Sequence, residues 1–320
     1  NTFKGELSLD EINKLTKNLG KSLLNINLTG GEPFARKDII DIAKIYLKNT
    51  LIQSMYITTN ASFPDRIETF AKSINSIDRE LELNFQISID ELPEKHNKIR
   101  KIKNLFDNCL DTYRRIQKLN LDNVNPVVSI TVSLENCDNI KNIFYYLTSK
   151  CKLDSLKCTI VRDEGIYKIP FEKKRKIYDA YAWLTSKIQE MTKERKINNY
   201  NLKSIQGRLN NKKDNISWDM INKIYMKPQY ISPCHAGSLF GIITSNGLVY
   251  PCEILEDRML GNLRENDMDF MKIWSNKLNK RTKEFIIKSK CNCTYECALS
   301  FNILGNWRYQ PQLAKAAIGY

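Results

Sequence analysis

Five of the nine cysteines lie close together in the last third of the sequence, at positions 234, 252, 291, 293 and 297. The first two enclose the run C-H-A-G-S-L-F-G-I-I-T-S-N-G-L-V-Y-P-C, and the other three lie in C-N-C-T-Y-E-C. Thiolates at such intervals typically bind an iron–sulfur cluster or a zinc ion, because soft sulfur ligands select these metals. Buried structural cysteines are the alternative, but they have no reason to recur at one- and three-residue intervals beside polar residues. His235 is an outside candidate for a further ligand.

The remaining cysteines give no such pattern. Cys109, Cys137, Cys151 and Cys158 are scattered through apolar segments and are predicted to be mostly core residues. The sequence has no signal-type opening and no apolar stretch of about 18 residues, so nothing places it in or across a membrane. We therefore predict a cytoplasmic protein, in which metal-bound or catalytic thiols are expected rather than a disulfide framework.

The chain is strongly basic, with 50 Lys and Arg against 36 Asp and Glu and a net charge of +14. Such an excess favours nucleic acid or another acidic partner. The lysines are spread along the whole sequence, however, together with many Asn and Ile residues. The densest runs, Lys173–Lys176 and Lys193–Lys196, lie on predicted helix surfaces. A solvated basic surface is therefore the preferred interpretation, and no nucleic-acid partner is predicted.

Helical and extended patterns alternate through the first half of the chain, and its 320 residues with 42% hydrophobic content can bury a large core. This alternation predicts an α/β fold with a parallel sheet, helices outside it and functional loops at the carboxyl ends of the strands. Polar and glycine residues do gather at those ends. The expected strands are 23–28, 53–59, 81–89, 127–134 and 156–161, and the expected helices are 8–18, 36–48, 64–76, 103–119 and 138–149.

The pattern changes after the fifth strand. A long polar helix is expected over 171–194, followed by an Asn- and Lys-rich stretch, 197–215, without periodicity, which suggests a connector or a flexible insertion. The segments Leu239–Thr244 and Leu248–Tyr250, separated by Ser-Asn-Gly, predict a hairpin that brings Cys234 and Cys252 together. The expected domains are 1–165, 166–232 and 233–320.

Three ordered motifs resemble a known family. Leu28–Pro33, L-T-G-G-E-P, resembles the GGE motif of the radical S-adenosylmethionine (SAM) superfamily. Ile87–Glu91 with the following His96-Asn97 and Ile99-Arg100 resembles the fourth-strand segment of members that carry a SPASM or twitch auxiliary-cluster domain. The spacing C-x12-G-x4-C fits the opening of that domain. The resemblance implies a partial (β/α)6 TIM-like barrel, with five of six strands present, and a small C-terminal cysteine-rich twitch/SPASM domain.

The resemblance also implies a SAM site. In the family the residues equivalent to Gly30, Gly31 and Glu32 bind the ammonium end of SAM, and Ser88 corresponds to a position facing its ribose or carboxylate. Simpler roles stay open: a tight turn for the glycines, a turn cap for Asp90, and for Arg100 a surface ion pair instead of a contact to the SAM carboxylate. His96 is expected to order its loop. The predicted SAM-binding residues are Gly30, Gly31, Glu32, Asn60, Ser88, Asp90, Arg100 and Arg162.

One family feature is missing. The CxxxCxxC loop, whose thiolates bind the cluster that cleaves SAM, occurs nowhere in the sequence. In the family this loop follows the first barrel strand, and the missing sixth strand falls at the same place. We therefore expect an upstream segment that contains strand one and a second, SAM-cleaving 4Fe–4S cluster. A degenerate member that never had the loop is the alternative.

The C-terminal thiolates suffice for one auxiliary 4Fe–4S cluster. The family's longer group, C-x2-C-x5-C-x3-C with a further cysteine downstream, is reduced here to C-x-C-x3-C. The spacing of Cys293 and Cys297 matches the last pair of that group. The preferred ligands are therefore Cys234, Cys252, Cys293 and Cys297, with Cys291 as a competitor for the fourth place. Zinc could use the same thiolates, but the barrel motifs favour iron and sulfide.

Together these features predict a radical SAM enzyme that abstracts hydrogen from a peptide or protein substrate and is reduced by an electron donor such as flavodoxin or ferredoxin. Oxidation or rearrangement of a small molecule such as a sugar is the first alternative. A non-catalytic metal- or RNA-binding protein on a degenerate barrel is the second. Binding to random RNA that weakens steeply with salt would favour the latter.

Overall fold

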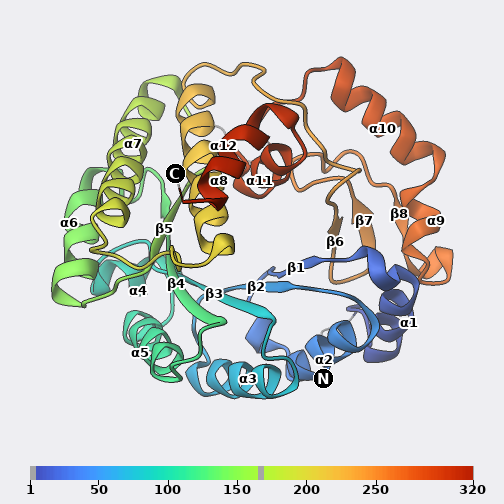
Figure 1. The fold of residues 1–320 in the computed structure, drawn as a ribbon, viewed down its shortest axis with the longest axis horizontal. Coiled ribbons are helices and arrows are strands. Elements are labelled where there is room, and N and C mark those ends of the chain that lie inside the picture. The colour runs from blue at the N-terminus through green and yellow to red at the C-terminus, as the bar shows by residue number, and fades with distance from the viewer. Residues whose placement is uncertain (1–4, 165–168, 320) are drawn as a thin grey trace. The chain divides into compact units, whose positions relative to one another are not determined.

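Five strands form one sheet in a computed structural model of the chain, which describes residues 5–164 and 169–319 (Figure 1). Their spatial order, β1-β2-β3-β4-β5, follows the sequence order. The pairs β1–β2, β2–β3 and β3–β4 are parallel, with Leu28 opposite Ile57 and Ile87 opposite Val128. The predicted α/β fold is thus confirmed. The strands are β1 Asn25–Leu28, β2 Ser54–Thr59, β3 Glu82–Ser88, β4 Val124–Val132 and β5 Leu156–Ile160.

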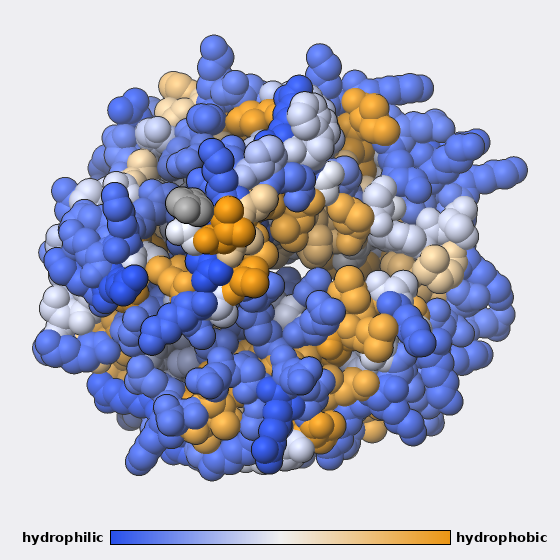
Figure 2. All heavy atoms as spheres, viewed as in Figure 1, coloured by the Kyte–Doolittle hydropathy of each residue, from blue (hydrophilic) through white to orange (hydrophobic). Residues whose placement is uncertain are grey.

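The chain divides into two compact units, which are described separately. The first comprises Asn1–Ile130, Thr244–Leu248 and Gly261–Ile273, and the second comprises Thr131–Ile243, Val249–Leu260 and Trp274–Tyr320. Among the described residues, no helix has both the length and the apolar character needed to span a membrane. The visible surface is mainly hydrophilic with scattered apolar groups, in keeping with the high content of Lys, Asn and Glu (Figure 2).

Helices of the first unit pack beside strands β1 to β3 (Figure 1). The capping box predicted at Ser8 is present, with Ser8 N and Oγ bonded to the side chain and backbone of Glu11. Three buried rings, Phe34, Phe70 and Phe85, pack together with centroids 5.5–6.3 Å apart, and such pairs contribute beyond their buried area. The helices are α1 Leu9–Leu19, α2 Ile39–Asn49, α3 Pro64–Ile77, α4 Pro93–Arg100 and α5 Leu105–Lys118.

The second unit contains β5 and most of the C-terminal helices. Helix α7 packs against β5, and α8 packs against α11 and α12. The predicted hairpin is present, with Ile242 opposite Tyr250 in an antiparallel pair. The remaining elements are α6 Ile140–Tyr145, α7 Phe171–Lys193, α8 Ile205–Ile224, β6 Ile242–Ile243, β7 Leu248–Tyr250, β8 Gly261–Asn262, α9 Phe270–Trp274, α10 Lys277–Lys288, α11 Glu296–Leu304 and α12 Gln310–Ala317.

The expectation of an irregular stretch over 197–215 is wrong, because helix α8 begins at Ile205. Ser204 caps it by accepting a hydrogen bond from Gly207 N at 2.9 Å. Its first half is polar, and its buried apolar residues begin only at Ile216. Inside that polar half, the buried Asp214 pairs with Lys157 at 2.9 Å. The helix therefore depends on tertiary contacts that the local pattern does not show.

Candidate functional site

The loop after β1 presents exposed backbone at the carboxyl edge of the sheet. Gly30 has φ +129°, a conformation that residues with a side chain rarely adopt, so the turn itself requires glycine at this position. No atom lies within 4 Å of the position that a Cβ would take at Gly30 or at Gly31. Both glycines are also exposed, so a ligand can approach the backbone of this loop closely.

Glu32 connects the ends of β1 and β2. Its Oε1 accepts hydrogen bonds from Phe34 N at 3.1 Å and Thr59 Oγ1 at 2.7 Å. Its Oε2 accepts one from Asn60 N at 2.7 Å. Both carboxylate oxygens are thus used within the protein, and the side chain stabilises the loop rather than extending as a free anion.

Asn60 and Ser88 end neighbouring strands, and Cys109 of helix α5 links them. The Cys109 thiol donates to the backbone oxygen of Asn60 at 3.4 Å and lies 3.7 Å from that of Ser88. The Asn60 side chain accepts from Ser62 N at 2.9 Å, which fixes the following turn. Burial raises the pKa of Cys109 to about 12, so this thiol stays protonated. Sequence reasoning placed Cys109 in the core and missed its position under the predicted SAM site.

Asp90 and Arg100 form an ion pair with each other. Asp90 N also donates to His96 Nδ1 at 3.3 Å. Burial lowers the pKa of His96 to about 4, so the imidazole is neutral at pH 7 and orders its loop, as expected. The ion-pair alternative for Arg100 agrees with this contact, and the Arg100 side chain is 34% exposed. Contacts of Asp90 and Arg100 with SAM stay predictions.

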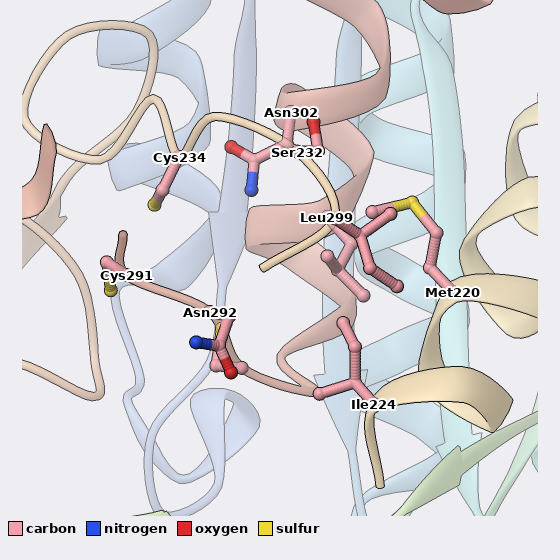
Figure 3. Close-up of a pocket in the computed structure, with 10 residues that line it drawn as sticks. Met220, Ile224, Ser232, Cys234, Cys291, Asn292, Leu299 and Asn302 are labelled. Atoms are coloured by element: carbon pink, nitrogen blue, oxygen red, sulfur yellow. The ribbon is translucent and has the colours of Figure 1, made fainter. Parts of the chain in front are cut away.

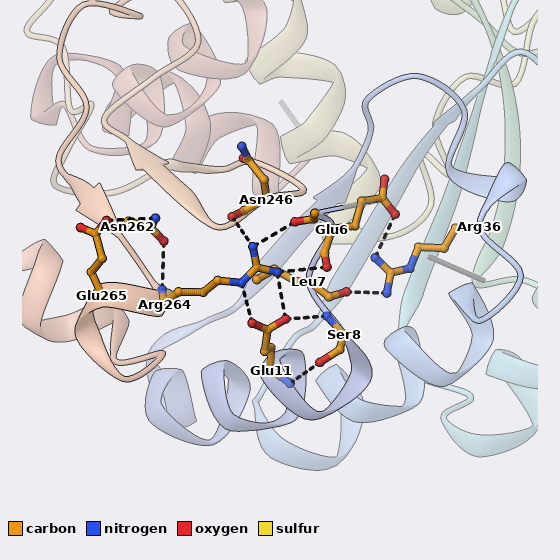
Figure 4. A network of polar contacts seen from close by, with 10 residues as sticks. Glu6, Leu7, Ser8, Glu11, Arg36, Asn246, Asn262, Arg264 and Glu265 are labelled. Carbon is orange, nitrogen blue, oxygen red and sulfur yellow. Dashed lines mark hydrogen bonds and ion pairs between the residues drawn. The ribbon is translucent and has the colours of Figure 1, made fainter. Parts of the chain in front are cut away.

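Two arginines fix the segment that precedes α1 (Figure 4). Arg264 contacts Glu11 with two nitrogens, at 2.6 and 3.1 Å, and also donates to the carbonyls of Gly5 and Glu6. Arg36 donates to the carbonyl of Leu7 at 2.7 Å. The contact with Arg264 lowers the pKa of Glu11 to about 2. Both arginines thus orient a segment that sequence reasoning had treated only as the start of a helix.

The second candidate site contains the cysteines of the second unit. Cys234, Cys291 and Cys293 line one pocket, which Met220 and Ile224 of α8 and Leu299 of α11 close on its apolar side. The thiols of Cys234 and Cys291 point toward one another (Figure 3). Cys252 packs in the adjoining apolar cluster, against which Cys234 and Cys291 also pack.

The thiols influence one another electrostatically. A hydrogen bond from Cys291 lowers the pKa of Cys234 to about 7, whereas the pKa of Cys291 is raised by that same bond, by burial and by the charges of Cys234, Cys293 and Cys252. Burial raises the pKa of Cys293 to about 12. Gathered thiols of this kind need a cation to be ionised together, which is the environment that a metal cluster provides.

Cys297, at the start of α11, contacts a different neighbour. Its thiol is hydrogen-bonded to Tyr295, and burial raises its pKa. Arg162 lies over the Tyr295 ring at 4.7 Å and pairs with Glu253 at 3.2 Å. The structure therefore places Arg162 beside residues that flank the cysteines, and its predicted role in SAM binding stays a prediction.

Two carboxylates that sequence reasoning missed fix the C-N-C-T-Y-E-C loop. Glu164 accepts hydrogen bonds from Thr294 N at 2.9 Å and Thr294 Oγ1 at 3.2 Å. Glu296 accepts one from Ile160 N at 3.2 Å, at the end of β5. The loop is therefore tied to the sheet by contacts across more than 100 residues of sequence, which no local pattern could predict.

The donor set fits an iron–sulfur cluster in its chemistry. Cys234, Cys252, Cys291 and Cys293 share one small region, and thiolates are the usual ligands of such clusters. Within the described parts of the chain, no group of three or more His, Cys, Asp or Glu side chains has the arrangement of a metal site. Binding a cluster here therefore requires the thiols to turn toward a common centre. His235 bonds through its backbone N to Asn302 at 2.8 Å.

Two sequence-family models match parts of the chain. A family model described as the Radical SAM superfamily matches residues 2–142. A second model, SPASM, described as an iron–sulfur cluster-binding domain, matches residues 234–298. The first match contains the Gly30–Glu32 loop, and the second contains all five clustered cysteines.

Curated relatives match parts of the chain. A 7-carboxy-7-deazaguanine synthase of Methanocaldococcus jannaschii is 34% identical over 134 residues, which are 41% of this chain and 54% of that protein. A GTP 3',8-cyclase of Cronobacter sakazakii is 45% identical over 62 residues, 18% of each chain. The chain thus spans about half the length of the first relative and under a fifth of the second.

Solved structures match nearly the whole chain. The structure titled "Native anSMEcpe with bound AdoMet" has a TM-score of 0.60 at 16% identity and covers 98% of this chain and 89% of that one. The structure titled "Native anSMEcpe with bound AdoMet and Kp18Cys peptide" has a TM-score of 0.57 at 17% identity, with coverage of 98% and 90%. At this identity the likeness establishes the fold.

Proposed function

Because this chain belongs to the radical SAM superfamily and carries a SPASM domain, we propose that it binds SAM and an auxiliary iron–sulfur cluster and modifies a peptide or protein by hydrogen abstraction. Residues 1–165 would bind SAM, residues 166–232 would connect, and residues 233–320 would bind the auxiliary cluster. The observation that carries this proposal is the Gly30–Glu32 loop at the carboxyl edge of a parallel sheet. Hydrogen bonds from Thr59 and Asn60 to Glu32 hold this loop, and its glycines are open to a ligand.

The residues around this loop bind and orient the cofactor. The peptide groups at Gly30 and Gly31 are free of steric cover and can accept hydrogen bonds from the SAM ammonium group. Glu32 keeps them in place through Thr59 and Asn60. When bound and reduced, SAM and its cluster supply a 5′-deoxyadenosyl radical for hydrogen abstraction, while the protein orients the reactants and excludes water.

The cluster that cleaves SAM needs three thiolates in one loop, and no CxxxCxxC run occurs in these 320 residues. We propose that its ligands come from outside them. The reductant would be a one-electron donor such as flavodoxin or ferredoxin.

For the auxiliary cluster we propose Cys234, Cys252 and Cys293 as ligands. The contact between the Cys234 and Cys291 thiols favours Cys291 for the fourth place, ahead of Cys297, which bonds to Tyr295. This ranking reverses the one that spacing alone suggests. Replacing Cys291 and Cys297 separately by Ser and measuring bound iron decides between them.

A peptide substrate is supported by the solved structure whose title names a bound peptide, since that match covers 98% of the chain and includes its C-terminal unit. A small-molecule substrate is the second candidate. Both curated relatives carry small-molecule names, but they match only 41% and 18% of the chain.

The test measures SAM binding and 5′-deoxyadenosine separately. The 320-residue chain, loaded anaerobically with iron and sulfide, should bind SAM in equilibrium dialysis yet form no 5′-deoxyadenosine with dithionite. Gly31→Val fills the open space at the loop without requiring a positive φ, so it should abolish SAM binding while the circular dichroism spectrum stays unchanged. Absence of SAM binding by the parent chain would contradict the site, and steady 5′-deoxyadenosine formation would contradict an external cluster loop.

A further inference from the structure

Helix α10, which lies immediately before the cysteine loop, has an exposed face that is both basic and apolar. Three large apolar side chains on it are exposed: Leu278 by 51%, Phe285 by 36% and Ile287 by 74%. Six cations occur between positions 277 and 290, against a single acidic residue, Glu284. The outer face of α10 is defined here as Lys277, Leu278, Lys280, Arg281, Glu284, Phe285, Ile287, Lys288 and Lys290, all of them exposed.

The cations of this face lack the ion pairs that some cations on other helices make. Within residues 5–164 and 169–319, no ion pair involves the side chains of the outer face of α10. On α7, by contrast, Arg175 pairs with Asp179 and Lys187 pairs with Glu190. Arg258, which pairs with Asp257 at 3.9 Å, lies over the Phe285 ring at 3.5 Å. Figure 2 shows mainly hydrophilic side chains in the region of α10, with apolar groups among them.

The inner face of α10 contacts the region of the thiols. Ile286 is buried in one apolar cluster with Cys252, and Cys234 and Cys291 pack against that cluster. Cys291 N donates to the carbonyl of Ile286 at 3.1 Å. Asn279 fixes the start of the helix, since its Nδ2 donates to the carbonyls of Gly237 and Trp274 at 3.0 and 2.6 Å. Only one helix thickness, about 10 Å, therefore separates the outer face from the cysteines.

We propose that the outer face of α10 docks an acidic one-electron carrier protein, which delivers an electron to the auxiliary cluster. This inference rests on the proposed cluster at these cysteines. The carrier loses one electron and is oxidised, and the cluster gains it and is reduced, with no bond made or broken. Unpaired cations steer an acidic partner and set its association rate, while a few exposed apolar side chains suit a small, transient interface.

Other occupants fit the face less well. A helix that lies in a membrane surface buries one continuous apolar face, but the buried side of α10 is packed against protein. Its exposed apolar side chains are also divided by a basic row, with Leu278 and Phe285 on one flank and Ile287 on the other. Nucleic acid would use the cations and leave these apolar side chains unused.

The experiment uses an oxidised flavodoxin, an acidic flavoprotein, as the probe. Binding to the cluster-loaded chain is measured by fluorescence anisotropy of labelled flavodoxin at low and at moderate salt. Arg281→Glu with Lys288→Glu should weaken binding at least about tenfold. The matched control, Lys173→Glu with Lys193→Glu, changes the net charge equally on exposed positions of α7 and should change affinity less than about twofold.

A second variant separates docking from simple charge attraction. Ile287→Ala should weaken flavodoxin binding while leaving the binding of a random RNA unchanged. The proposal would be overturned if the double variants on α10 and on α7 weakened flavodoxin binding equally. It would also be overturned if the outer face of α10 bound RNA or phosphatidylglycerol vesicles more tightly than flavodoxin. Iron per chain is measured on every sample. A chain that binds iron but shows no α10-dependent docking refutes this inference alone, whereas a chain that binds no iron refutes the proposed cluster.

Discussion

Glu32→Ala should destabilise the first unit and weaken SAM binding indirectly. The carboxylate accepts three hydrogen bonds, from Phe34 N, Thr59 Oγ1 and Asn60 N, at 3.1, 2.7 and 2.7 Å. Bonds to charged groups contribute about 1.5–3 kcal/mol when buried. Glu32 is only partly buried, so water can replace part of each lost hydrogen bond. We therefore assign about 1 kcal/mol to each of the three bonds. The expected loss in the free energy of unfolding is about 3 kcal/mol.

Two further variants divide this loss. Glu32→Gln keeps one acceptor oxygen but turns an NH2 group toward Asn60 N. We expect this variant to lower the free energy of unfolding by about 1–2 kcal/mol. Thr59→Val removes one donor to Glu32, and also the acceptor for Ala61 N at 2.9 Å. The double variant Glu32→Ala with Thr59→Val should show a coupling energy of about 1 kcal/mol, since the two residues are in contact.

The assay is urea unfolding followed by circular dichroism, with SAM affinity measured on the same samples. If Glu32 acts through the loop, SAM affinity and stability fall together across these variants, and Thr59→Val lowers both without touching the carboxylate. Unchanged stability in Glu32→Ala combined with a loss of SAM binding would refute the reasoning. It would show instead that the carboxylate binds the SAM ammonium group directly.

Two other predictions concern the first unit. Arg264→Ala should lower the free energy of unfolding because several hydrogen bonds are lost. It should also flatten the pH dependence of that free energy below pH 4.5. The reason is that Glu11, with its pKa lowered to about 2, stabilises the folded chain above its ordinary pKa of 4.5 and loses this effect as the pH falls toward 2. A parent chain whose stability is constant over that range would contradict the assignment. Gly30→Ala should lower the free energy of unfolding by about 1–3 kcal/mol in the same assay, because Gly30 has φ +129°. Its control, Gly31→Ala, should lower the free energy of unfolding by less than about 1 kcal/mol. Equal losses would show that the turn does not need glycine at position 30.

The sheet could be predicted because its strands are apolar runs separated by helical patterns, and all five appear within a few residues of the expected positions. Helix α8 could not, because its first half is mainly polar and its buried apolar residues begin only at Ile216. Its stability comes from contacts such as that between Asp214 and Lys157, which lie far apart in the sequence. The hairpin between Cys234 and Cys252 was predictable, since its turn has a local signature.

The candidate sites were predictable as positions but not as contacts. The motif around Glu32 located the loop, yet the bond from its carboxylate to Asn60 depends on the register that places Leu28 opposite Ile57. Cys109 has the surroundings of a core residue in the sequence, and only the packing of α5 brings its thiol under Asn60 and Ser88. Cysteine spacing similarly gave the set of possible ligands without showing which thiols are adjacent.

The most direct test of the account is the metal content of the chain after anaerobic reconstitution. We expect about four irons per chain with broad thiolate-to-iron absorption, because the thiols at Cys234, Cys252, Cys291 and Cys293 can bind one cluster. Cys252→Ser should abolish both signals, whereas Cys158→Ser, at a buried cysteine on β5, should leave them unchanged. Stoichiometric zinc without iron in protein purified anaerobically, or full iron content in Cys252→Ser, would contradict the auxiliary cluster.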